Sequence, residues 1–83
     1  MREKVSKERI EAGLLQLMKE IQRRLKQHGD REFIGPHEIL GTVTEEYHEL
    51  IEAVRSNDRD ETRKELLDVA VATLFGYISL TKE

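Results

Sequence analysis

The stretch that decides the fold is Leu66–Leu80, which reads LLDVAVATLFGYISL and contains one charged side chain, Asp68. Because a helix turns by about 100° per residue, the apolar side chains cover well over half of its circumference. The stretch is too short to span a bilayer, which needs about 20 apolar residues. A helix that is apolar on nearly all sides is buried on most of them, and we expect this one to be buried.

A narrow strip interrupts the apolar surface of this helix. Two acids lead into a line of small side chains, and together they are Glu65, Asp68, Ala72, Gly76 and Ser79. We interpret the strip as a groove that is kept open for another group.

Two breaks, at residues 28–36 and 56–58, divide the rest of the chain into helical segments without strand-like alternation. The first helix is expected over Lys7–Gln27, with Ser6 as its N-cap and Gly29 at its C-terminal end. The sequence therefore predicts an all-α fold, in which each protomer has three helices.

The second helix is expected to start at Pro36, because a first-turn residue does not need its N–H group. Asp58 is the predicted N-cap of the third helix, with Glu61 as its capping-box partner.

The size of the chain predicts a single helical domain, residues 1–83, that assembles with copies of itself. Of the 83 residues, 37% are hydrophobic and 37% are charged. A monomer of this size buries only about 60% of its unfolded surface, so its core is marginal. Three helices can scarcely surround Leu66–Leu80, and we expect a second copy to complete the bundle.

Composition excludes several classes of function. The formal net charge is −3 and the bases form no patch, which argues against nucleic-acid and membrane partners. The chain has no cysteine, which excludes disulfides, zinc-thiolate sites and cysteine nucleophiles. The charged N-terminal residues lack an apolar signal core, so we expect a cytoplasmic location.

Two pairs of acids form the candidate site. Glu46 and Glu49 share one face of the second helix because they are three residues apart, and Glu65 and Asp68 repeat this spacing on the third. Antiparallel packing of the two helices would bring the pairs together, and four carboxylates at one seam repel one another unless a cation neutralises them. Oxygen ligands favour Mg²⁺, Mn²⁺ or Ca²⁺. The alternative is that the acids are solvated surface charges.

The two acidic motifs resemble a known family. Glu45-Glu46-Tyr47-His48-Glu49-Leu50, followed by Glu65-Leu66-Leu67-Asp68-Val69-Ala70, is similar to the MazG-like group of all-α NTP pyrophosphohydrolases. The resemblance covers almost the whole chain. It implies a helical homodimer or tetramer that cleaves nucleoside triphosphates to monophosphate and pyrophosphate, with many members acting on unwanted or non-canonical nucleotides.

The resemblance also implies roles for individual residues. Glu46, Glu49, Glu65 and Asp68 would bind Mg²⁺, with Mn²⁺ as the other candidate ion. Glu45 and Glu46 are the candidate catalytic residues, and Glu45 would position or activate water. Larger family members have basic groups on a further helix, and Arg63 and Lys64 are the candidates to bind phosphate in their place.

Three alternatives stay open at this point. One is a phosphoribosyl-ATP pyrophosphohydrolase-like enzyme, which shares the chemistry. Another is a non-catalytic module of the same fold that binds a nucleotide or a protein partner without turnover. The last is a plain structural bundle whose acids are only surface charges.

Overall fold

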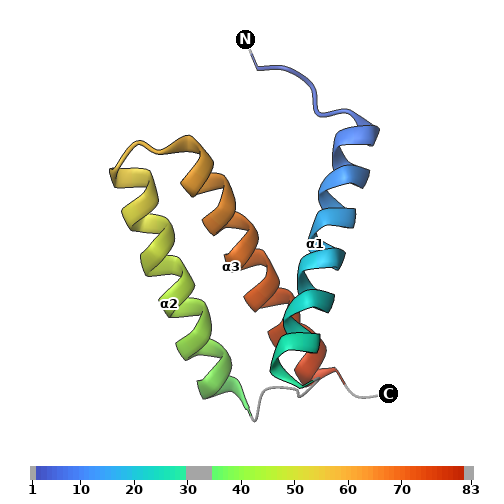
Figure 1. Cartoon of the computed structure of the whole chain (residues 1–83), viewed down its shortest axis with the longest axis vertical. Coiled ribbons are helices and arrows are strands. Elements are labelled where there is room, and N and C mark those ends of the chain that lie inside the picture. Colours follow the sequence, from blue (N-terminus) through green and yellow to red (C-terminus); the bar gives the residue numbers. More distant parts are fainter. Residues whose placement is uncertain (1, 30–34, 82–83) are drawn as a thin grey trace. The chain divides into compact units, whose positions relative to one another are not determined.

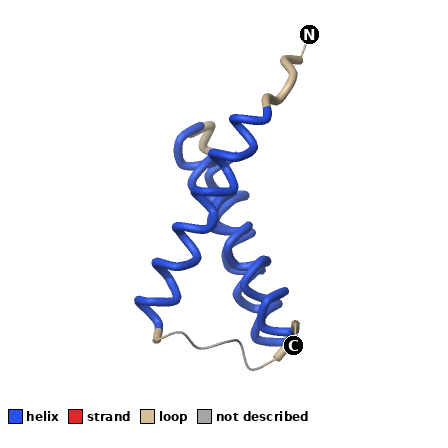
Figure 2. The backbone as a smooth tube through the Cα atoms, turned by 90° about the vertical axis from the view of Figure 1, so that its right-hand side faces the viewer, coloured by secondary structure: helices blue, strands red, loops and turns tan. Residues whose placement is uncertain are grey.

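A computed structural model of the chain describes residues 2–29 and 35–81. The chain forms three helices, α1 (Lys7–His28), α2 (Pro36–Arg55) and α3 (Arg59–Leu80), and the described residues contain no strand (Figures 1 and 2). The predicted all-α class is confirmed. Most of the first predicted break, residues 30–34, lies outside the described residues.

The structure divides into two compact units, Met1–Asp30 and Arg31–Glu83, and the first of them contains α1. The Ser6 hydroxyl accepts a hydrogen bond from the Arg9 backbone N–H at 3.1 Å, as expected of an N-cap. Gly29 adopts the left-handed conformation at φ 84°, and its N–H donates to the Leu25 carbonyl. Both predicted ends of this helix are therefore correct to within one residue.

The second unit is a hairpin of α2 and α3, which run antiparallel (Figure 1). Its turn is closed by a hydrogen bond from the Ser56 N–H to the Glu52 carbonyl at 3.0 Å, and Asn57 takes a left-handed conformation at φ 59°. Asp58 Oδ1 accepts from the Glu61 N–H at 3.0 Å, which confirms the predicted N-cap of α3.

The line of small residues on α3 is packed against α2 rather than left open. Ala72, Gly76 and Ser79 are all buried. An ideal Cβ atom built on Gly76 would lie 2.6 Å from Cγ2 of Ile39. The expectation of an open groove is therefore wrong at Gly76, because a branched side chain from α2 already occupies the space.

The helix α3 keeps a large apolar surface that α2 does not cover. Its large apolar side chains with about half or more of their surface exposed are Leu66 (53%), Tyr77 (70%), Ile78 (47%) and Leu80 (57%). The packing of α2 against α3 thus leaves part of the apolar surface of α3 uncovered. Across residues 2–29 and 35–81, no helix combines the length and the apolar character that crossing a bilayer requires.

Candidate metal centre

The seam between α2 and α3 positions the acids of both motifs. Glu46 is half-buried on α2, and Glu49 lies exposed one turn further along the same face. On α3, Asp68 is half-buried and Glu65 is buried, with only 4% of its surface exposed. The two helices are antiparallel, so both pairs are brought to the same level of the hairpin.

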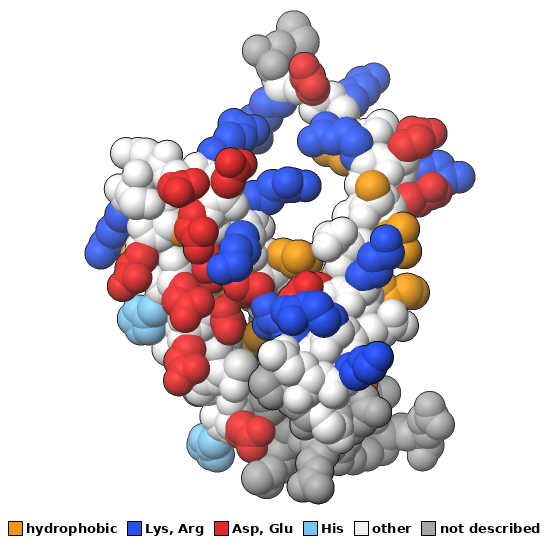
Figure 3. All heavy atoms as spheres, viewed as in Figure 1, with side chains coloured by type: hydrophobic (Ala, Val, Ile, Leu, Met, Phe, Trp, Pro, Cys, Tyr) orange, Lys and Arg blue, Asp and Glu red, His pale blue; other side chains and the backbone are white. Residues whose placement is uncertain are grey.

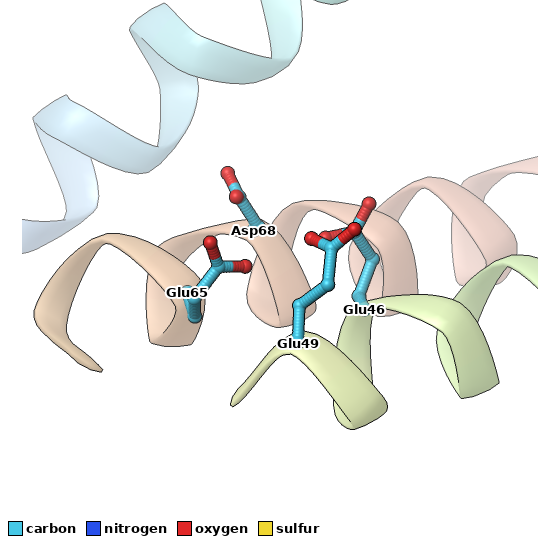
Figure 4. Close-up of side chains that lie close together, drawn as sticks. All are labelled: Glu46, Glu49, Glu65 and Asp68. Carbon is cyan, nitrogen blue, oxygen red and sulfur yellow. The ribbon is translucent and has the colours of Figure 1, made fainter. Parts of the chain in front are cut away.

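The four carboxylates form one cluster. One oxygen of each carboxylate lies within 4.8 Å of an oxygen of every other. Figure 4 shows the four side chains gathered on one side of the helix pair, with Glu46 and Glu49 rising from α2 and Glu65 and Asp68 from α3. The predicted juxtaposition of the two motifs is therefore present in the structure.

The electrostatics of the cluster are unfavourable without a cation. Burial raises the pKa of Glu65 to about 7, and the neighbouring carboxyls of Glu61, Asp68 and Glu49 act in the same direction. Acidic side chains gather over α2 and the adjoining part of α3 in the space-filling view (Figure 3). The buried Glu65 carboxyl thus keeps its proton to a higher pH than an exposed glutamate does.

A divalent cation fits this donor set. Glu65 Oε2 is buried and has no hydrogen-bond partner in the described part of the chain, which is costly for a carboxylate oxygen. Four carboxylates offer only hard oxygen ligands, the kind that Mg²⁺, Mn²⁺ and Ca²⁺ prefer. A bound cation would supply the missing partner of Glu65 and offset the repulsion among the four acids.

Of the other predicted site residues, Glu45 and Arg63 are exposed, whereas Lys64 lies beside the acidic cluster. Glu45 is exposed on α2 and does not belong to the four-acid cluster. Arg63 is also exposed, on α3. Lys64 is close to the acids, because its Nζ lies 3.7 Å from Glu65 Oε1.

A fifth acid, Glu61, was missed as a neighbour of the site. We expected it only as a capping-box partner, yet its carboxyl helps to raise the pKa of Glu65. Its Oε1 also lies 3.6 Å from Lys64 Nζ. The signal was available in the sequence, because Glu61 precedes Glu65 by four residues and Asp68 by seven and so shares their helix face.

Comparison with known proteins decides the family. The family model of the MazG nucleotide pyrophosphohydrolase domain matches residues 35–82, which is more than half of the chain. The chain belongs to this family. The matched range of the MazG domain contains α2, α3 and all four clustered acids. No curated protein and no solved structure matches the chain significantly.

Membership confirms the resemblance seen in the sequence. It places the chain among nucleotide pyrophosphohydrolase domains, which are generally dependent on divalent metals. The acidic cluster of this MazG domain is in keeping with that dependence.

Proposed function

We propose that the chain hydrolyses nucleoside or deoxynucleoside triphosphates to monophosphate and pyrophosphate in the presence of Mg²⁺, and that it serves to remove unwanted nucleotides. The observation that carries the proposal is the cluster of Glu46, Glu49, Glu65 and Asp68, with oxygens within 4.8 Å of one another. Mn²⁺ is the other ion that this oxygen set would accept.

Each clustered acid has a role in this proposal. Glu46 and Glu49 from α2 and Glu65 and Asp68 from α3 hold the cation. When bound, such an ion clamps phosphate oxygens and offsets developing negative charge. Glu46 is also proposed as a catalytic residue, because it is next to Glu45, which orients the attacking water.

The reaction needs water and no protein nucleophile. Water adds to the α-phosphorus, the bond to the bridging oxygen breaks, and pyrophosphate leaves with that oxygen. Glu45, on the same turn as Glu46, orients the water and takes up its proton. Arg63 and Lys64 precede the acids of α3 and bind phosphate oxygens.

Product analysis tests this function. The purified protein is incubated with a panel of NTPs, dNTPs and phosphoribosyl-ATP, with Mg²⁺ or Mn²⁺, and the products are resolved by ion-exchange chromatography. We expect monophosphate and pyrophosphate, and we expect Asp68→Asn to abolish them. Glu52→Gln is the matched control, because Glu52 is an exposed acid of α2 that does not belong to the cluster.

The panel also separates the alternatives. Turnover of phosphoribosyl-ATP alone would favour the phosphoribosyl-ATP pyrophosphohydrolase-like enzyme. Metal-dependent nucleotide binding without any turnover would favour a non-catalytic binding module. The absence of both metal binding and turnover would leave the structural bundle and contradict the proposal.

We propose in addition that residues 1–83 act as one domain within a homodimer or tetramer. A row of apolar side chains on α2 supports this assembly. Leu40, Tyr47 and Val54 are spaced by seven residues and are 63%, 54% and 53% exposed. A spacing of seven keeps side chains on one stripe of a helix, as at helix–helix seams.

The helix α1 also has an apolar face that needs a partner. Ile10, Leu14 and Met18 recur at steps of four and are each more than half exposed. An isolated helix of this length is marginal in water, so covering this face in an assembled bundle would stabilise it.

The oligomeric state is measured by sedimentation velocity. We expect a dimer or tetramer for the natural sequence and dissociation of Val54→Lys. Glu52→Lys is the control, because it adds a lysine nearly opposite Val54 on the helix. A monomer at all concentrations, or equal dissociation of both variants, would contradict the assembly.

A further inference from the structure

Lys64 lies at the edge of the acidic cluster although it is not one of the acids. Its Nζ is 3.6 Å from Glu61 Oε1 and 3.7 Å from Glu65 Oε1. The side chain of Glu65 is only 6% exposed, whereas that of Lys64 is 66% exposed. An exposed surface cation is thus paired with the most buried acid of the cluster.

Lys64 carries a positive charge near neutral pH, because the ordinary pKa of a lysine side chain is about 10.4. At 3.6 Å from Glu61 Oε1 and 3.7 Å from Glu65 Oε1, the ammonium offsets part of the negative charge of the cluster.

A divalent cation at the same acids would be repelled by this ammonium. Both would be held by Glu65, so they would be separated by only a few ångström. The repulsion between a double and a single charge at such a distance is enough to change an affinity on the order of tenfold, even in a water-like medium.

We propose that Lys64 is a displaceable counter-ion, which neutralises the cluster in the metal-free protein and moves to a phosphate oxygen when a metal–polyphosphate complex binds. This inference rests on the proposed function. The side chain can make the move because it is mostly exposed and has four rotatable methylene groups.

A specific thermodynamic signature follows. The metal alone must displace Lys64 from Glu65 and leave it with Glu61 as its acidic partner, so it binds more weakly than it would without this lysine. A polyphosphate anion that arrives with the metal provides a new partner for the displaced ammonium. Metal and polyphosphate therefore favour each other's binding, and the coupling is reciprocal.

The test uses two ligands, and Lys64→Met is expected to change the affinities for them in opposite directions. The affinities for Mn²⁺ alone and for the preformed Mn²⁺–tripolyphosphate complex are measured by isothermal titration calorimetry. Lys64→Met should bind Mn²⁺ about tenfold more tightly than the natural sequence, because the repelling charge is gone. It should bind the tripolyphosphate complex several-fold more weakly, because a phosphate partner is lost.

Arg59→Met is the matched control. It removes the same charge from an exposed residue in the first turn of the same helix. We expect both affinities of this variant to stay within about twofold of the natural sequence. Like the natural sequence, Lys64→Arg should bind Mn²⁺ alone more weakly than the Mn²⁺–tripolyphosphate complex, because it preserves the charge.

The outcomes separate this inference from the proposed function. If Lys64→Met and Arg59→Met bind Mn²⁺ alike, or if Lys64→Met does not weaken binding of the tripolyphosphate complex, the counter-ion role is overturned while the metal site stands. If the natural protein binds no Mn²⁺ at all, the proposed function and this inference fall together.

Discussion

Ile39 of α2 occupies the space that a side chain on Gly76 of α3 would need, with its Cγ2 2.6 Å from an ideal Cβ position. Gly76 lies eight residues beyond Asp68, and Ile39 lies seven residues before Glu46. At about 1.5 Å per residue, the contact is therefore two helical turns from the acidic cluster on both helices. The close approach at Gly76 occurs in the same register of the two helices that brings the two acidic pairs together.

Gly76→Ala is expected to destabilise the protein although alanine is the better helix former. The added Cβ would collide with a β-branched side chain whose χ1 rotamer is restricted in a helix. Overpacking of this kind costs about 1–3 kcal/mol. Urea denaturation measures the loss, and Mn²⁺ affinity should fall with it because the register shifts.

Gly41→Ala is the control for this substitution. Gly41 also lies inside a helix, but an added Cβ would meet nothing within 4 Å. Here we expect a gain of about 0.5–1 kcal/mol from helix propensity. Equal effects of the two substitutions would show that Ile39 does not restrict Gly76.

Metal binding should stabilise the folded protein. An ion that binds only the native state at 100 times its Kd adds about 2.7 kcal/mol to the free energy of unfolding. We expect Mg²⁺ or Mn²⁺ to raise the Tm, EDTA to reverse the rise, and Asp68→Asn or Glu49→Gln to abolish it. Glu52→Gln should retain it. A rise of equal size in all variants would place the ion elsewhere.

The metal-free protein should become less stable as the pH rises toward 7. The pKa of Glu65 is raised from 4.5 to about 7 in the folded chain. Between these values the native state holds a proton that the unfolded state has lost. The contribution of Glu65 therefore falls as pH rises through about 7, by at most about 1.4 kcal/mol per pH unit, and levels off only when the pH is well above this value.

Glu65→Gln isolates this contribution. Metal-free protein is denatured with urea from pH 5 to pH 8.5. Relative to the natural sequence, the free energy of unfolding of the variant should rise as the pH passes through about 7, and the difference should persist above it. Relief of the buried charge accounts for the gain. A difference between the two proteins that does not change with pH would contradict the raised pKa.

Asp58→Ala should cost about 1 kcal/mol, because it removes the oxygen that accepts the Glu61 N–H at the start of α3. Asp58→Asn should lose much less, since an amide oxygen can accept the same bond. Thermal unfolding followed by circular dichroism compares them. Equal losses would assign the effect to charge rather than to capping.

Much of the local structure could be predicted from the sequence. The cap residues Ser6 and Asp58 and the first-turn residue Pro36 mark the starts of the three helices, and the structure begins them at the next residue or at Pro36 itself. These signals are local, because each depends on hydrogen bonds or φ angles within one turn. The i, i+3 spacing of the acids likewise places each pair on one helix face.

The environment of the site was harder to predict from the sequence than the local structure. The sequence showed that Glu65 lies in the same strip as Gly76, but it did not show that α2 fills the strip at Gly76. The sequence suggested that Lys64 binds phosphate, but it did not show that Lys64 lies close to Glu61 and Glu65. These relations depend on side-chain conformation and on the depth to which neighbouring groups cover each acid.

By itself, the sequence determined the helical class, the starts of the three helices, the end of the first helix and the two acidic pairs, because helix periodicity and capping act over a few residues. Only the tertiary structure decided the register of α2 against α3. In that register Ile39 packs against Gly76, a contact between residues far apart in the chain. It brings the four carboxylates within 4.8 Å of one another and buries Glu65 among them.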